Sequence, residues 1–164
     1  MFSRRAVLGG TALAAILGGA ALLRMRGAAA ATPSGHFEIE KTDAEWRKIL
    51  TPRQYEVLRE HDTERPWTSP LNDEHRKGVF ACAGCDLPLY SSEAKFDSGT
   101  GWPSFFQPLP DAIATSEDRS FLMTRIEVHC RRCGGHLGHV FDDGPPPTGK
   151  RYCMNGAALK FIPA

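Results

Sequence analysis

The five cysteines are the residues of this chain with the clearest chemical potential, and four of them form two pairs. Each pair has the Cys-x2-Cys spacing, in Cys82-Ala-Gly-Cys85 and in Cys130-Arg-Arg-Cys133. Thiolates at this spacing are typical ligands of a tetrahedral zinc ion. Because four thiolates close the coordination shell, we expect one structural zinc ion per chain that takes no part in catalysis.

Two alternatives exist for these four cysteines. A disulfide within each pair would close only a very short loop and would stabilise the fold little. Histidines near the second pair could replace a thiolate ligand, but the matched pairs favour a set of four thiolates. These histidines are His129, His136 and His139. The long interval between the pairs indicates that the ion connects distant parts of the domain.

Cys153 is left without a partner once the two pairs are assigned. Lys150 and Arg151 precede it, and neighbouring positive charge favours the thiolate, which is the reactive form of cysteine. A buried, inert cysteine is the alternative. The flanking charges and the proline-rich approach favour an exposed, reactive thiol.

Two other segments carry side chains that could converge on this thiol. His136 and His139 lie in Gly-His-Leu-Gly-His-Val-Phe and could donate protons. Trp102 lies in Ser-Gly-Thr-Gly-Trp-Pro-Ser-Phe and could supply an apolar wall. Taken singly, each of these residues is more often a core or surface residue than a catalytic one.

Local signals predict the helices that open the domain. Thr42 and Glu45 match a capping box. Thr51 can cap a second helix, and Pro52 suits the first position of that helix. The remainder of the chain is poor in helical periodicity. We therefore expect a mainly β fold: a compact antiparallel β domain with two or three short N-terminal helices and the zinc site.

Short apolar runs separated by glycine and proline indicate strands beyond Gly78. These runs lie at residues 79–81, 87–90, 121–128, 137–141 and 159–162. Within the third run, Ile126 and Val128 alternate with Arg125 and Glu127. This alternation predicts a half-buried antiparallel strand with the two apolar residues on its buried face.

Two proline-containing segments are expected to be loops. The polar segment 63–76 predicts an ordered loop, pinned by Trp67 and Leu71. The segment Gly144-Pro-Pro-Pro-Thr-Gly149 cannot continue a central strand, because proline donates no hydrogen bond to the ladder. It is expected to deliver the chain to Cys153.

Residues 1–31 differ from the rest in composition. They hold four of the 20 basic residues and none of the 19 acidic ones, and Ser3-Arg4-Arg5 precedes an apolar stretch. This pattern resembles a twin-arginine export signal, and an uncleaved membrane anchor is the alternative. Residues 32–42 are expected to be a linker, and residues 43–164 the domain. The domain carries net negative charge, so nucleic-acid binding is not indicated.

Several motifs occur together in one order. Phe96–Phe105, Gly134–Phe141 and Arg151–Asn155, with both cysteine pairs between and before them, resemble the methionine sulfoxide reductase B family. The resemblance covers about residues 43–164 and is highly specific, because it rests on several independent motifs. It implies two small sheets, and it implies reduction of the R epimer of methionine sulfoxide in oxidised proteins to methionine.

The resemblance also implies roles for individual residues. Cys153 matches the family's nucleophile, and Trp102 matches its substrate-methyl pocket. The proton-donating and water-binding groups match His136, His139 and Asn155. Phe105 and Phe141 are weaker candidates, either for the substrate wall or for packing.

The chain departs from many family members at Thr100, where they carry a second, resolving cysteine. Attack on the sulfoxide leaves Cys153 as a sulfenic acid, which a second thiol can reduce through a disulfide. With the other cysteines committed to zinc, we expect reduction by a thioredoxin-like or other external thiol. The remaining expected partners are oxidised proteins and the twin-arginine machinery, with export to the bacterial periplasm.

Two rival functions remain open from the sequence. The chain could be a zinc-stabilised interaction module in which Cys153 is incidental. It could also be another thiol oxidoreductase or a peroxidase that uses the same sulfenic acid chemistry. Loss of reductase activity with retained zinc in a Cys153→Ser variant would exclude the first rival.

Overall fold

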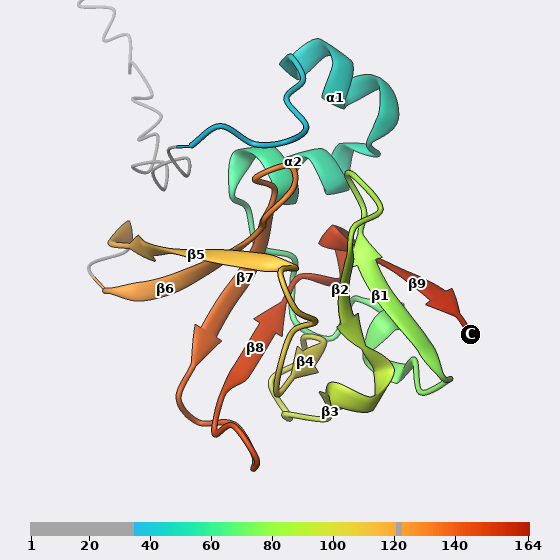
Figure 1. Ribbon diagram of the computed structural model, residues 1–164, viewed down its shortest axis with the longest axis vertical. Coiled ribbons are helices and arrows are strands. Elements are labelled where there is room, and N and C mark those ends of the chain that lie inside the picture. The colour runs from blue at the N-terminus through green and yellow to red at the C-terminus, as the bar shows by residue number, and fades with distance from the viewer. Residues whose placement is uncertain (1–34, 121–122) are drawn as a thin grey trace, which may run out of the picture.

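The structure is a computed structural model that describes residues 35–120 and 123–164 (Figure 1). The expected export segment at residues 1–31 lies outside the described residues. Within the described ranges, no helix is long and apolar enough to cross a membrane.

Two short helices open the domain, as predicted. They are α1 (Asp43–Ile49) and α2 (Pro52–Glu60). Both capping boxes are present, with the Thr42 hydroxyl accepting from the Glu45 amide and the Thr51 hydroxyl accepting from the Gln54 amide. The two helices lie across one end of both sheets, as Figure 1 shows.

All strand pairs are antiparallel, and they form two sheets. The three-stranded sheet has the order β2 (Pro88–Ser91), β1 (Gly78–Cys82), β9 (Leu159–Pro163). The six-stranded sheet has the order β3 (Lys95–Phe96), β4 (Ser104–Phe105), β8 (Arg151–Met154), β7 (His136–Phe141), β6 (Arg125–Cys130), β5 (Ile113–Asp118). Short 3-10 helices are η1 (Pro70–Asp73), η2 (Ser92–Ala94) and η4 (Gly156–Ala158). The expected mainly β fold with two small antiparallel sheets is therefore confirmed.

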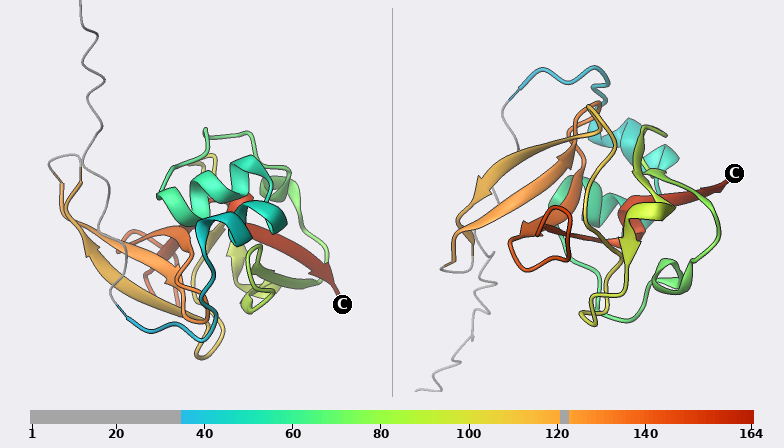
Figure 2. Two further views of the ribbon diagram at one scale, coloured as in Figure 1. Left: turned by 90° about the horizontal axis from the view of Figure 1, so that it is seen from above. Right: turned by 60° about the horizontal axis from the view of Figure 1, so that its bottom comes forward.

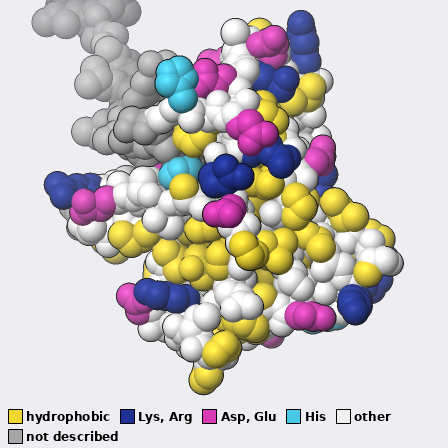
Figure 3. Space-filling model, in the orientation of Figure 1, with side chains coloured by type: hydrophobic (Ala, Val, Ile, Leu, Met, Phe, Trp, Pro, Cys, Tyr) yellow, Lys and Arg dark blue, Asp and Glu magenta, His cyan; other side chains and the backbone are white. Residues whose placement is uncertain are grey.

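The β5–β6 hairpin extends away from the helices, as the view from above in Figure 2 shows. On the face drawn in Figure 3, hydrophobic side chains gather over the middle of the molecule, and acidic and basic side chains are scattered among one another around it.

An aromatic cluster fills the space between the two sheets. Tyr90 of β2 stacks on Phe105 of β4 with ring centroids 4.3 Å apart, and Phe80 of β1 meets Phe105 edge-on at 5.0 Å. All three side chains are fully buried. Phe105 was expected as a substrate wall, but its ring is inaccessible because it packs in this core. We therefore describe it as a core residue.

The strand predictions hold where apolar runs are uninterrupted and fail elsewhere. β1, β2, β7 and β9 lie within about one residue of their predicted runs. β6 begins only at Arg125, and residues 121–122 are outside the described ranges. β5 was missed because its sequence Ile-Ala-Thr-Ser-Glu-Asp is mostly polar, and β3 and β4 were missed because each has two residues.

The predicted alternation along β6 is correct at Val128, which is fully buried, and wrong at Ile126 and Glu127. Ile126 is 41% exposed, whereas Glu127 is 2% exposed. The reason is that Glu127 has buried polar partners, so its carboxylate is compensated for the loss of water. These partners are His61, Ser116 and His136.

The loop after α2 is ordered, but only one of the two residues expected to pin it packs inward. Leu71 packs against the core. Trp67 is 65% exposed, and its amide donates to the Gly101 carbonyl at 2.7 Å. The backbone of Trp67, not its ring, therefore holds the loop in place.

The aromatic cluster predicts a large stability effect at Phe105. Phe105→Ala should lower the free energy of unfolding by about 3–5 kcal/mol, because it leaves a cavity between the sheets. Urea denaturation followed by circular dichroism measures this change. Phe106→Ala, at the half-buried neighbouring position, is the matched control and should cost much less. Equal losses in the two variants would contradict this account of the core.

Candidate active site and cysteine cluster

β8 places Cys153 in the middle of the larger sheet. It pairs with β4 on one side, where Cys153 is opposite Ser104, and with β7 on the other, where it is opposite His139. The strands approach closely here, since a Cβ on Gly138 would lie 2.1 Å from the Cys153 carbonyl oxygen. Strand register therefore brings the cysteine and one of the predicted histidines side by side.

A cavity of about 120 Å³ lies next to the cysteine. It is lined by Thr63, Trp102, Arg125, Gly138, His139, Phe141, Cys153 and Asn155. Four residues predicted from the sequence therefore meet at one cavity: Cys153, His139, Asn155 and Trp102. Phe141, a weaker candidate, also lines it. His136 lies behind this wall, with its ring centroid 5.5 Å from that of His139.

The cysteine is less exposed than its neighbouring charges suggested. Lys150 pairs with Asp142, and Arg151 binds Asp143 through two hydrogen bonds of 2.8 and 2.7 Å. Burial raises the pKa of the Cys153 thiol, and the Thr100 hydroxyl and the Arg151 charge lower it by less. The net pKa lies above its ordinary value of 9.0, so the resting side chain is a neutral thiol at neutral pH.

A chain of hydroxyl groups leads away from the cysteine sulfur. Thr100 Oγ1 is 3.8 Å from Cys153 Sγ, and Ser98 Oγ is 2.8 Å from both Thr100 Oγ1 and Ser104 Oγ. Ser104 in turn donates to the Trp102 carbonyl at 3.1 Å. The Cys153 thiol and the three hydroxyl groups carry four hydrogens, one for each of the four contacts in this chain. When the thiol ionises, the chain can reverse so that Thr100 donates to the thiolate.

Each predicted histidine is hydrogen-bonded to a buried carboxylate that the sequence did not single out. His136 Nδ1 lies 2.7 Å from Glu127 Oε1, and His139 Nε2 lies 2.8 Å from Asp118 Oδ2. Such bonds fix the tautomer and the orientation of an imidazole ring. In the described part of the chain, His136 Nε2 is buried without a hydrogen-bond partner.

The electrostatics of these pairs keep the carboxylates charged. Burial raises the pKa of Glu127, but hydrogen bonds from His136 and Ser116 and the close approach of His61 outweigh burial and hold the pKa well below its usual range. The pKa of Asp118 is also strongly lowered: hydrogen bonds from Ser120 and His139 and the Arg125 charge outweigh burial. Burial lowers the pKa of His139 despite Asp118, so its imidazole is neutral at neutral pH.

Only the fold reveals why these two carboxylates matter. Asp118 ends β5 and Glu127 lies on β6, where it pairs with His139 of β7. The one signal in the sequence is that acidic residues interrupt strands next to the histidine motif. Their partners depend on strand register, which the sequence alone does not specify.

The amide of Asn155 and the indole of Trp102 are both held by one backbone segment. Asn155 Oδ1 accepts from the Glu64 amide at 3.0 Å, and its Nδ2 donates to the Leu137 carbonyl at 3.2 Å. Trp102 Nε1 donates to the Glu64 carbonyl at 3.0 Å. Glu64 was not identified from the sequence, where it is one of many charged loop residues.

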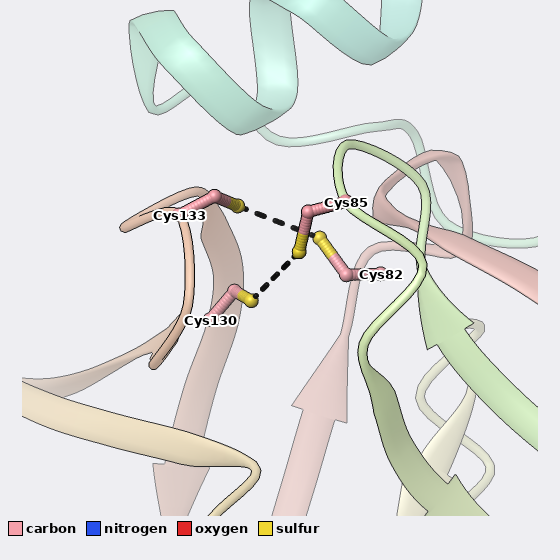
Figure 4. A group of neighbouring side chains, drawn as sticks. All are labelled: Cys82, Cys85, Cys130 and Cys133. Carbon is pink, nitrogen blue, oxygen red and sulfur yellow. Dashed lines mark hydrogen bonds between the residues drawn. The ribbon is translucent and has the colours of Figure 1, made fainter. Parts of the chain in front are cut away.

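The four remaining cysteines converge from two turns, as Figure 4 shows. Their sulfur atoms all lie within 4.8 Å of one another, with Cys82 and Cys133 3.8 Å apart and Cys85 and Cys130 3.5 Å apart. A tetrahedral zinc ion with Zn–S bonds of about 2.3 Å would separate its ligands by about 3.8 Å. The spacing is therefore consistent with a structural zinc site.

The donor chemistry and the location of this cluster fit the same interpretation. All four cysteines are free of disulfides, and three of them are buried. His129 packs edge-on against Phe37 with ring centroids 5.9 Å apart and is not a member of the cluster. The cluster joins the turn after β1 to the turn between β6 and β7, so it connects the two sheets.

Comparison with known proteins agrees with this arrangement. Residues 50–163 match the SelR domain family. The peptide methionine sulfoxide reductase MsrB of Agrobacterium fabrum is 54% identical over 127 residues, which cover 77% of this chain and 94% of that protein. The protein of the same name from Methanosarcina barkeri is 56% identical over 124 residues, covering 75% and 87%. That from Leifsonia xyli is 55% identical over 131 residues, covering 79% and 94%. The chain therefore belongs to the SelR domain family of methionine sulfoxide reductases B.

Proposed function

We propose that the protein reduces the R epimer of methionine sulfoxide in oxidised proteins, with Cys153 as the nucleophile. The observation that carries the proposal is the cavity where Cys153, His139, Asn155 and Trp102 meet, in a chain of this family. The relatives that share this sequence are named peptide methionine sulfoxide reductases. A rival zinc-stabilised interaction module would not require these side chains to line one cavity.

In the proposed reaction, the Cys153 sulfur attacks the sulfoxide sulfur while the sulfoxide oxygen takes up a proton. The transient bond between the two sulfur atoms and the S–O bond of the sulfoxide then break, the oxygen forms a bond to the Cys153 sulfur, and methionine leaves, so that Cys153 becomes a sulfenic acid. The proton can come from the Cys153 thiol itself, since the raised pKa keeps it protonated in the resting enzyme. His139 lines the cavity beside the sulfur and is the group proposed to pass this proton to the oxygen.

The remaining cavity residues are proposed to bind the substrate. Trp102 and Phe141 supply apolar surface for the methyl group of the sulfoxide, and the Asn155 amide can donate to its oxygen. His136 does not line the cavity. Its unpaired Nε2 could reach the substrate or His139 through a water molecule.

The sulfenic acid is proposed to be reduced by an external donor. Thr100, 3.8 Å from Cys153 Sγ, occupies the place from which a second cysteine would act. An incoming thiol displaces water from the sulfenic acid and forms a mixed disulfide. A second thiol then releases Cys153 as a thiol and leaves the donor oxidised. A thioredoxin-like dithiol supplies both equivalents.

We further propose that the four-cysteine cluster holds one structural zinc ion. Cys82, Cys85, Cys130 and Cys133 would hold it, and a closed four-thiolate shell supplies stability and no catalytic chemistry. In this role the ion holds the end of β1 against the β6–β7 turn. The histidines of the proposed active site lie on β7, so this link also supports their position.

The proposed reaction predicts discrimination between sulfoxide epimers. With dithiothreitol as reductant, the enzyme should reduce the R epimer of a methionine sulfoxide peptide and not the S epimer, as measured by chromatography of the product. Cys153→Ser should lose activity by roughly a thousandfold or more, because the nucleophile is removed. Activity only on the S epimer, or undiminished activity in Cys153→Ser, would contradict the proposal.

The sulfenic acid can be trapped in a separate experiment. When the enzyme is treated with the sulfoxide substrate and no reductant, dimedone should label Cys153. An internal disulfide of Cys153 would exclude external reduction.

The raised pKa of Cys153 predicts slow alkylation at neutral pH. The rate with iodoacetamide, followed by mass spectrometry of the Cys153 peptide, should rise about tenfold per pH unit between pH 6 and 8, because only the thiolate reacts. Thr100→Val removes a donor to the thiolate and should raise the pKa further. Its rate at pH 8 should fall by about fivefold, which corresponds to about 1 kcal/mol. Thr115→Val, on exposed β5, is the control, and an equal or faster rate in Thr100→Val would refute the role of the hydroxyl.

The zinc proposal predicts a metal content of about one ion per chain by plasma emission spectrometry. Cys133→Ser should lose most of this zinc and lower the free energy of unfolding by several kcal/mol, since structural zinc binding contributes directly to folding. Cys153→Ser is the matched control and should keep its zinc and its stability. Full stability in zinc-free wild-type protein would show that the cluster does not need an ion.

A further inference from the structure

Glu64 is a buried acidic residue that touches the active-site walls without lining the proposed catalytic cavity. It is 6% exposed and lies in the loop after α2, next to Thr63, which does line the cavity. Its carboxylate accepts from the backbone amides of Gly156 and Ala157, the second at 3.1 Å. The side chain therefore fastens this loop to the segment that directly follows Asn155.

The main chain of the same residue holds both polar ends of the cavity wall. Its amide donates to Asn155 Oδ1 at 3.0 Å, and its carbonyl accepts from Trp102 Nε1 at 3.0 Å. One residue thus makes four hydrogen bonds that join three separate segments. The loop also packs tightly here, since a Cβ on Gly156 would lie 1.8 Å from Ser69 Oγ and 3.2 Å from Glu64 Oε1.

The chemical nature of Glu64 suits this function. Burial raises the pKa of its carboxyl, and the amides of Gly156 and Ala157 lower it by less. A buried carboxyl with no partners would be strongly unfavourable, so its position depends on these two donors. Arg53, the nearest cation acting on it, is already paired with Glu56 and Asp62. The Glu64 carboxylate is therefore held by backbone amides. Unlike side chains, these donors cannot turn away by changing rotamer.

These bonds determine what the cavity presents to a substrate. With Oδ1 facing the Glu64 amide and one Nδ2 hydrogen on the Leu137 carbonyl, Asn155 keeps a second hydrogen without a partner among the described residues. The hydrogen bond from Trp102 Nε1 to the Glu64 carbonyl likewise restricts the tilt of the indole ring. A donor and an apolar face held at fixed separation can distinguish the oxygen and the methyl group of a sulfoxide.

We propose that Glu64 is a positioning residue that sets epimer selectivity by holding the Asn155 amide and the Trp102 indole in register. This inference rests on the proposed reductase function. Misplacement of binding groups by about 1 Å can reduce a rate by about a hundredfold. Loss of the Glu64 carboxylate should therefore weaken the preference for one epimer as well as the rate.

The test uses Glu64→Ala and Glu64→Gln in the full-length, zinc-loaded protein, with Glu60→Gln, at an exposed position of α2, as the matched control. Glu64→Ala should lower kcat/KM for the R epimer by about 10- to 100-fold and reduce the ratio of R to S turnover. Glu64→Gln keeps one acceptor oxygen, so its kcat/KM and its ratio of R to S turnover should lie between those of Glu64→Ala and wild type. Glu60→Gln should match wild type. Cys153 alkylation at pH 8 should stay within about twofold in all variants, because the hydroxyl chain does not involve Glu64.

A second readout does not depend on activity. In nitrogen-15 correlation spectra, the Trp102 indole N–H and the Asn155 amide signals should shift and exchange faster with water in Glu64→Ala, and not in Glu60→Gln. Unchanged signals, or an activity loss with an unaltered epimer ratio, would overturn the positioning role. If wild type reduces neither epimer, the proposed function fails, whereas altered signals in Glu64→Ala would still establish the link to Asn155 and Trp102.

Discussion

The pairing of β8 between β4 and β7 is the constraint on which the site depends. It places Cys153 opposite Ser104 on one side and opposite His139 on the other, and His139 lines the same cavity as the cysteine. A slip of one residue in this register would turn the cysteine to the opposite face of the sheet. The close approach at Gly138 and the proline-rich loop before Arg151 both serve this single alignment.

Burial and hydrogen bonding act in opposite directions on the ionisable groups around the site. Burial raises the pKa of Cys153 and lowers that of His139, so both groups are neutral at neutral pH. The hydrogen bonds around Glu127 and Asp118 have the opposite effect, because they keep these two carboxylates ionised beside His136 and His139. A neutral thiol and a neutral imidazole, next to an ionised carboxylate, can exchange a proton without an isolated buried charge.

Local signals in the sequence predicted what local interactions determine. The capping boxes at Thr42 and Thr51 were correct because their partners lie within three residues. The cysteine pairs could be recognised because the two members of each pair are close in sequence, although the pairs meet only in the fold. The roles of Glu64, Asp118 and Glu127 could not be predicted, since each bonds to residues from distant strands or loops. The alternation on β6 failed at Ile126 and Glu127 for the same reason, because a tertiary hydrogen-bond network overrode the polarity of Glu127.

The presence of Thr100 changes how the site can complete a cycle. A cysteine there would lie close enough to Cys153 to form a bond after a small movement, and the site would resolve its own sulfenic acid. A hydroxyl can donate a hydrogen bond to the thiolate or accept one from the thiol, but it cannot carry electrons. In the proposed reaction, this hydroxyl at 3.8 Å can therefore stabilise the attacking thiolate, but reduction of the sulfenic acid depends on a thiol from solution. In the proposed cycle the sulfenic acid forms as methionine is released, so reduction by the external donor is the second of two half-reactions.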